Sequence, residues 1–229
     1  MMTVFMLFEA LDSGQISKQS IIPISDNARG QEPTKIGFRQ GGTIDVDTAI
    51  RALVIRSAND VAVATGEFLG GTEQNFAMLM TQRARQMGMV STTFRNASGL
   101  PNPGQQTTAR DLALLSIALR KRFPHHYHYF GSREFVYAGK TIRGHNDLLG
   151  RVPGVDGLKT GYIRSSGFNL ATSVERGGRQ MVAVVLGGQT TKSRNAHMEE
   201  LIERYMPMTS SVAVSASPRP RSGVLAAFN

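Results

Sequence analysis

The feature that most constrains this chain is a Lys-Thr-Gly triplet, Lys159–Gly161, set between two apolar runs. The runs 152–158 and 168–172 predict neighbouring β-strands, so the triplet falls on a strand near its end. There, lysine supplies positive charge, Thr160 supplies a directional hydrogen bond, and Gly161 lets a substrate backbone lie close. Such a set is suited to binding a carboxylate. Alone, however, the triplet is common in surface loops, where its lysine would be solvated.

A second motif, Ser57-Ala58-Asn59, lies about a hundred residues upstream. It falls at the predicted junction of two helices, where a short turn can present a hydroxyl and an amide to a cleft. Taken alone, Ser57 and Asn59 are more simply explained as caps of a helix that begins near Asp60. Together with Lys159 they match one catalytic set, so we predict that both motifs line the same cleft.

The periodicity of apolar residues separates a mostly helical first half from a strand-rich second half. Thr72 and either Thr107 or Thr108 are placed to cap two of the helices. We therefore predict a mixed α/β (α+β) fold in which an antiparallel sheet packs against helices and a mostly helical subdomain. The predicted helices are 3–13, 45–55, 60–69, 72–87, 111–120 and 192–205, and the predicted strands are 134–137, 141–143, 155–162, 167–174 and 180–186.

Composition narrows the choice of partners and compartment. The 229 residues carry a formal net charge of +9 and no cysteine, so disulfides and thiol chemistry are excluded and anionic surroundings are favoured. The basic residues are scattered and no nucleic-acid-binding motif stands out, which argues against nucleic acid and leaves peripheral association with a membrane open. As written, the first residues lack a signal peptide, which predicts a cytoplasmic chain.

From these motifs outward, the chain resembles the serine-type D-alanyl-D-alanine carboxypeptidases, the low-molecular-mass penicillin-binding proteins. The resemblance extends over roughly Met1 to Tyr205. Its motifs are Ser57–Asp60, Gly99-Leu100, Asn146-x-Leu148-Leu149, Gly154–Gly161 and Val185–Gly188. It implies a β-lactamase or DD-peptidase-like catalytic domain over residues 1–205 and no cofactor. Residues 206–229 are rich in Ser, Pro, Ala and Arg without periodicity, which predicts a linker or disordered tail.

The resemblance also implies roles for individual side chains. Ser57 would relay a proton toward the leaving amine, and Asn59 would hold the substrate amide. Lys159 would polarise Ser57 and attract the terminal carboxylate, to which Thr160 would hydrogen-bond. The backbone N–H of Tyr162 would be one oxyanion-hole donor.

Two further substrate-binding residues are implied by the same resemblance. Gly161 completes the triplet, and Arg194 matches a basic residue near the carboxylate pocket. From the residues alone, Arg194 is equally explained as an ion-pair partner of Glu199. The implied substrates are peptidoglycan stem peptides ending in D-Ala-D-Ala, and β-lactams would bind as their mimics.

The chain departs from the family pattern at one place. The family's Ser-x-x-Lys motif, which carries the nucleophile, has no counterpart, and Met1-Met2-Thr3 with Phe8-Glu9 matches the segment directly after it. We therefore expect that the sequence starts just after the catalytic lysine and that two first strands are missing. We also expect this form to be inactive, and unstable or poorly soluble. The full-length protein would belong to the periplasm or cell envelope.

Two alternatives remain open from the sequence: a catalytically dead module that binds muropeptides or β-lactams and, more weakly, a class A-like β-lactamase. The segment His125-His126-x-His128 has spacing that suits a metal. With no carboxylate nearby in sequence, we interpret it as a surface loop and predict no metal site.

Overall fold

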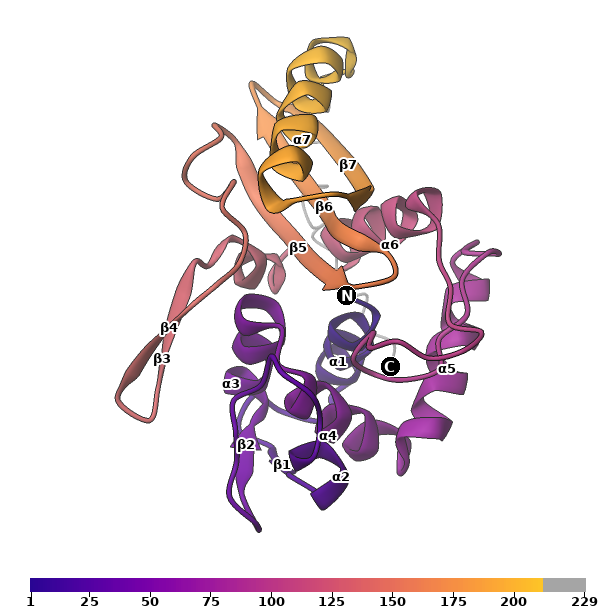
Figure 1. The fold of residues 1–229 in the computed structure, drawn as a ribbon, viewed down its shortest axis with the longest axis vertical. Coiled ribbons are helices and arrows are strands. Elements are labelled where there is room, and N and C mark those ends of the chain that lie inside the picture. Colours follow the sequence, from indigo (N-terminus) through magenta and orange to yellow (C-terminus); the bar gives the residue numbers. More distant parts are fainter. Residues whose placement is uncertain (212–229) are drawn as a thin grey trace, which may run out of the picture.

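The structure, a computed structural model, describes residues 1–211. A three-stranded antiparallel sheet lies in the upper half of Figure 1, in the order β5 (Val155–Ile163), β6 (Gly167–Arg176), β7 (Arg179–Gly188). Helix α7 (Thr191–Tyr205) packs on β6 and β7 (Figure 1). Leu170, Val174 and Met198 belong to the apolar cluster between them.

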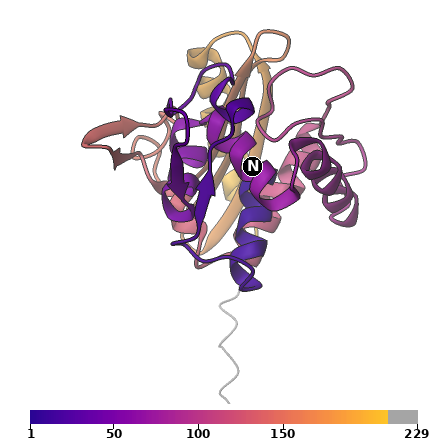
Figure 2. The same ribbon diagram turned by 90° about the horizontal axis from the view of Figure 1, so that it is seen from below.

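Helices dominate the lower half of Figure 1. The elements there and around the sheet are α1 (Met2–Asp12), β1 (Ile21–Pro23), α2 (Asp26–Arg29), β2 (Thr43–Asp45), α3 (Val46–Arg51), the π-helical turn η1 (Ala52–Arg56), α4 (Asn59–Gly70), α5 (Glu73–Gln86), α6 (Ala109–Arg122), the 3₁₀ turn η2 (Tyr127–Gly131), β3 (Glu134–Tyr137) and β4 (Lys140–Arg143). Strands β1 and β2 form one antiparallel pair, and β3 and β4 form a hairpin that projects sideways from the body (Figure 2).

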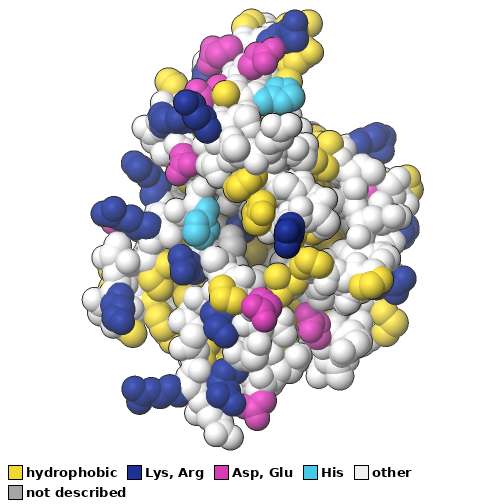
Figure 3. All heavy atoms as spheres, viewed as in Figure 1, with side chains coloured by type: hydrophobic (Ala, Val, Ile, Leu, Met, Phe, Trp, Pro, Cys, Tyr) yellow, Lys and Arg dark blue, Asp and Glu magenta, His cyan; other side chains and the backbone are white. Residues whose placement is uncertain are grey.

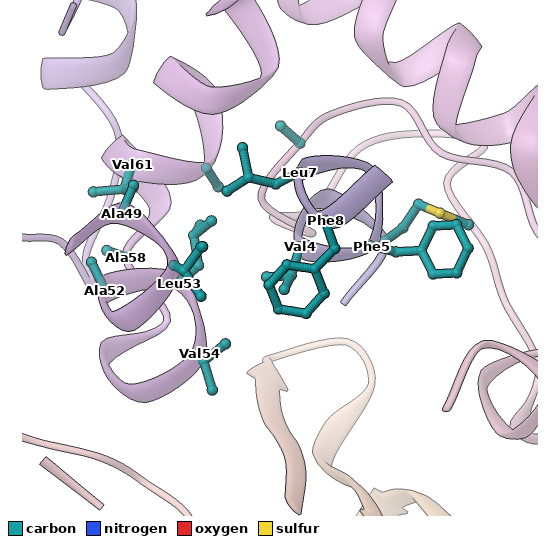
Figure 4. Close-up of a cluster of buried hydrophobic side chains, with 14 of the residues drawn as sticks. Val4, Phe5, Leu7, Phe8, Ala49, Ala52, Leu53, Val54, Ala58 and Val61 are labelled. Atoms are coloured by element: carbon teal, nitrogen blue, oxygen red, sulfur yellow. The ribbon is translucent and has the colours of Figure 1, made fainter. Parts of the chain in front are cut away.

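Helix α1 forms the centre of the larger apolar cluster. It is apolar around most of its circumference, and such a helix is stable only when it is buried on all sides. Its side chains Val4, Phe5, Leu7 and Phe8 are at most 4% exposed. Figure 4 shows them in one cluster with apolar side chains of the segment 49–61, which leads into α4.

Hydrogen-bonding side chains start several of the helices where the sequence predicts them. Thr72 accepts a hydrogen bond from the N–H of Asn75, and Thr108 accepts one from that of Asp111. The helix predicted over 45–55 is interrupted instead: Asp45 caps α3, and the following turns widen into η1. None of the helices within residues 1–211 is both long and apolar enough to cross a bilayer.

The described chain continues past residue 205, the predicted end of the catalytic domain. Met206–Met208 form a 3₁₀ turn, η3, and Met206 is buried. The guanidinium of Arg179 donates to the carbonyls of Pro207 and Thr209. The rest of the predicted tail, residues 212–229, lies outside the described residues.

A glycine before β5 supports a stability prediction. Gly154 has φ +76°, and a Cβ at this position would lie 2.3 Å from the carbonyl oxygen of Glu175. We expect Gly154→Ala to lower the free energy of unfolding by about 2–5 kcal/mol through left-handed strain plus overpacking. Gly139, with φ +75° and open space around it in the described part of the chain, is the matched control, and Gly139→Ala should cost only about 1 kcal/mol. Equal urea midpoints for the two variants would contradict this.

Candidate active site

A cleft of about 1220 Å³ runs between the helical region and the sheet. Both predicted motifs line it: Ser57 and Asn59 from the helical side, and Lys159–Gly161 from β5. The space-filling view shows the hollow near the middle of this face, with apolar side chains around it (Figure 3). Residues that lie far apart in the sequence, in the helical first half and the strand-rich second half, therefore line the same cleft.

The central contact of the cleft joins Lys159 to Ser57. The Lys159 ammonium donates a short hydrogen bond to Ser57 Oγ and a second one, of 2.8 Å, to the carbonyl of Thr160. The ammonium–hydroxyl contact links residues 102 positions apart. The solvated lysine that the triplet alone would suggest is thus not observed, because Lys159 lies half-buried against a partner from the other half.

The backbone at Ser57 is unusual. Ser57 ends the π-helical turn in the left-handed region, with φ 60°, a conformation that costs a non-glycine residue energy and occurs mainly where the surroundings impose it. Helix α4 has Ala58 at its N-cap position, with no side-chain capping bond from the described residues. The alternative that Ser57 and Asn59 simply cap a helix is therefore excluded by the geometry.

A segment that no sequence motif marks holds this turn. The hydroxyl of Thr34 donates to the carbonyls of Arg56 and Ser57 at 3.0 and 2.9 Å, and its carbonyl accepts from the N–H of Asn59 at 2.8 Å. The Asn59 amide nitrogen Nδ2 donates to the carbonyl of Glu32 at 2.9 Å. With Nδ2 engaged, the carbonyl oxygen of the Asn59 side chain is the atom suited to accept an N–H from a ligand.

Asp60 binds the same segment through the backbone of the residues that follow Thr34. Its fully buried carboxylate accepts from the N–H groups of Ile36 and Gly37 at 2.9–3.1 Å. A buried carboxylate is tolerated because these donors replace its water. The pattern of residues 15–40, which is typical of a loop, contains no signal for this contact.

The remaining residues of the triplet and its flank also line the cleft. A Cβ added to Gly161 would meet nothing within 4 Å among residues 1–211, so glycine here leaves open space on the cleft side instead of avoiding a clash. Thr160 lines the cleft beside it. The Tyr162 side chain is 58% exposed and its ring lies 4.5 Å from that of Phe168 on the neighbouring strand.

Arg194 is buried at the start of α7 and also lines the cleft. Its guanidinium donates to the side-chain oxygen of Asn195 at 2.8 and 3.1 Å and to the carbonyl of Asn169 at 3.3 Å. The alternative pairing with Glu199 is not formed, because Glu199 binds Arg151. Neutral oxygens thus orient Arg194, and no direct ion pair within the described residues compensates its charge.

The electrostatics of the cleft favour an anionic ligand. Burial, aided by the charge of Arg194, lowers the pKa of Lys159 to about 8. Burial also lowers the pKa of Arg194. The α-amino group of Met1 lies in the same cleft, where burial and the charge of Lys159 lower its pKa to about 5. The shifts of Lys159 and Arg194 show that these two cations lack full solvation, and a bound carboxylate would stabilise them.

His145 was not singled out from the sequence, yet it lines the cleft. Burial, followed by the charges of Lys159 and Arg56, lowers its pKa. Asp147, two residues on, accepts a long hydrogen bond of 3.4 Å from the amide of Asn195. A lone histidine after a hairpin offers no sequence signal for this position.

No carboxylate is close to His125 and His126 in the sequence, but the fold brings one to them. Asp12, at the end of α1, lies within hydrogen-bonding distance of both rings. These three residues form a group outside the cleft lining that has the ligand atoms to hold a metal ion.

The lowered pKa of Lys159 makes a testable contribution to stability. Its pKa is about 8 when folded and has an ordinary value of 10.5, so the unfolded state binds more protons between these values. Stability of the wild type should therefore rise relative to Lys159→Met as the pH increases from about 8 to about 10.5, by up to about 3 kcal/mol. Urea unfolding of both proteins across this range measures the difference. Parallel pH curves would show that Lys159 is not perturbed.

Comparisons with known proteins agree with this geometry. The D-alanyl-D-alanine carboxypeptidase family model matches residues 1–190. The chain is 31% identical to the D-alanyl-D-alanine carboxypeptidase DacD of Salmonella typhimurium over 210 residues, which are 89% of this chain and 54% of the relative. It is 31% identical to DacF of Bacillus subtilis over 88% of this chain and 53% of that protein. The chain thus spans about half the length of these curated relatives.

Solved structures show the same likeness. The D-alanyl-D-alanine carboxypeptidase DacD from Francisella tularensis matches with a TM-score of 0.86 and 26% identity, over 88% of this chain and 62% of that one. Penicillin-binding protein D2 from Listeria monocytogenes, in its ampicillin-bound form, matches with a TM-score of 0.80 and 32% identity, over 88% and 83%. With its antiparallel sheet, its helical region and the cleft between them, the chain belongs to the D-alanyl-D-alanine carboxypeptidase family.

Proposed function

We propose that this chain provides the substrate-binding cleft of a serine-type D-alanyl-D-alanine carboxypeptidase, which removes the terminal D-alanine of peptidoglycan stem peptides. The observation that carries the proposal is the contact between the Lys159 ammonium and Ser57 Oγ inside a cationic cleft. Membership of the family supports it. Under this proposal the C-terminal carboxylate of the peptide binds Lys159, Thr160 and Arg194.

In the proposed reaction, a serine hydroxyl transfers its proton to the lysine of the same Ser-x-x-Lys motif and attacks the carbonyl between the two D-alanines. The C–N bond breaks, the terminal D-alanine leaves as an amine that takes up a proton through Ser57, and water hydrolyses the resulting ester. Lys159 assists because a lysine with a pKa of about 8 exchanges protons readily near neutral pH. The peptide N–H of the substrate would donate to the side-chain oxygen of Asn59, and the N–H of Tyr162 would contribute to the oxyanion hole.

The attacking serine would come from a Ser-x-x-Lys motif placed directly before Met1. This placement is supported by the position of Met1, which lines the cleft together with Ser57 and Lys159. A lysine joined to the α-amino nitrogen of Met1 would enter the cleft beside Ser57. Location in the cell envelope, and peripheral association with anionic membrane surfaces through the net charge of +9, belong to the same proposal.

Binding of β-lactams is the second part of the proposal. The related Listeria protein has been solved in ampicillin-bound and cefotaxime-bound forms, and a β-lactam carboxylate carries the same charge as the peptide terminus. A module that binds such ligands without turnover forms no acyl-enzyme. A β-lactamase differs from the carboxypeptidase in that water rapidly hydrolyses the acyl-enzyme formed from the β-lactam. Release of D-alanine from a peptide and hydrolysis of a β-lactam together separate all three.

We predict that the cleft recognises the ligand's terminal carboxylate. An N-acetylated peptide ending in D-Ala-D-Ala should bind the 229-residue chain at least about tenfold more tightly than the same peptide ending in a carboxamide, because only the carboxylate pairs with the cations. Thr160→Val should reduce this preference severalfold, whereas Thr141→Val, on the exposed hairpin, should leave it unchanged. Calorimetric titration measures both. Equal affinity for the two peptides would rule out a carboxylate site.

We also predict a dependence on the upstream motif. A form extended by Ser-x-x-Lys directly before Met1, together with the strands that precede it in relatives, should form a covalent adduct with a fluorescent penicillin. The 229-residue form should not, and Ser-to-Ala replacement in the extension should abolish the adduct. A fluorescent band from the 229-residue form on a denaturing gel would mean that another residue, such as Ser57, is the nucleophile.

A further inference from the structure

An unassigned group of side chains lies at the end of α1, outside the lining of the cleft. It consists of Asp12, His125 and His126. Asp12 is separated from the two histidines by 113 and 114 positions in the sequence. The fold, and not sequence proximity, therefore assembles the group.

The ligand atoms converge on one point. Oδ1 of Asp12 lies 2.9 Å from Nε2 of His125 and 3.0 Å from Nε2 of His126. All three ligand atoms lie within 4.8 Å of one another. Around a tetrahedral ion with bonds of about 2.0–2.1 Å, neighbouring ligand atoms are roughly 3.3 Å apart, so a small outward shift of the side chains would admit the ion.

We propose that Asp12, His125 and His126 bind a divalent transition metal ion of the zinc type, which ties the end of α1 to the segment before η2. Imidazole nitrogens suit zinc, copper and nickel far better than magnesium or calcium, which prefer oxygen. Three protein ligands leave a coordination position open. Because Asp12 and His125 are exposed, water can fill that position.

The packing holds the site in place before any ion arrives. The ring of Phe8 stacks on that of His126, with centroids 4.8 Å apart and planes 27° apart. Phe8 and Asp12 are four residues apart and thus occupy the same face of α1. His128 Nδ1 donates to the carbonyl of His125 at 2.9 Å, which steadies the backbone that carries both ligands.

One feature limits the expected affinity. Coordination through Nε2 shifts the ring proton of His126 to Nδ1, which is buried without a partner among the described residues, and an unpaired buried donor is unfavourable. We therefore expect zinc to bind more weakly here than in closed structural sites with four protein ligands.

The test uses metal-free, tag-free 229-residue protein titrated with zinc chloride in a calorimeter. We expect one equivalent to bind, and the melting temperature to rise by roughly 5–10 °C at a hundredfold excess over the dissociation constant. Magnesium chloride at the same concentration should cause neither effect. Absence of zinc binding by the folded wild type would overturn the proposal.

Variants locate the site. His125→Ala and Asp12→Asn alter exposed side chains, so both should fold, and each should weaken zinc binding at least about tenfold. His197→Ala, an exposed histidine on α7, is the matched control and should bind like the wild type. Zinc affinity that stays within twofold of the wild type in both ligand variants, or that falls equally in His197→Ala, would overturn the assignment. Circular dichroism of each variant verifies folding before titration.

Discussion

The contact between the Lys159 ammonium and the Ser57 hydroxyl is the constraint on which the cleft depends. A lysine removed from water is costly unless oxygen acceptors replace the lost hydration. Here Ser57 Oγ and the Thr160 carbonyl do so. The contact requires β5 to pass beside the end of the π-helical turn, so it sets how the sheet and the helical region face each other. The low pKa of Lys159 is a result of the same burial.

The energetic cost of the backbone at Ser57 is offset by the segment that surrounds it. Its left-handed backbone is held by hydrogen bonds to Thr34, and this segment is in turn held by the buried carboxylate of Asp60. The apolar side chains of α1 pack against those of the segment 49–61, which carries the turn, and this packing supports it. A hydroxyl and an amide are thereby presented to the cleft on a rigid support, which suits the proposed recognition of a small peptide terminus.

Helix α1 connects two sites of different chemistry. Met1, directly before its first residue, enters the cationic cleft, whereas its last residue, Asp12, meets His125 and His126. The same apolar helix thus supports the cleft proposed to bind a D-alanine carboxylate and the group proposed to bind a metal ion. Because α1 is so thoroughly buried, an ion bound at its end would stabilise the helical region that forms one wall of the cleft.

Much was determined by the sequence alone. Local patterns predict the strands β5 to β7, the cap Thr72 and a cap at Thr107 or Thr108, because apolar period and capping chemistry act over a few residues. The two motifs of the cleft are predicted to lie together because they match one catalytic set. Only the tertiary structure decided four other features. These are the π-helical turn before Ser57, the hydrogen bonds of Thr34 and Asp60 that fix that turn, the position of His145 in the cleft lining, and the contact of Asp12 with His125 and His126. Each depends on contacts between residues more than twenty positions apart or on a backbone geometry that packing imposes. No local sequence pattern encodes these contacts, because each contributes to stability only when its distant partner residue is in place.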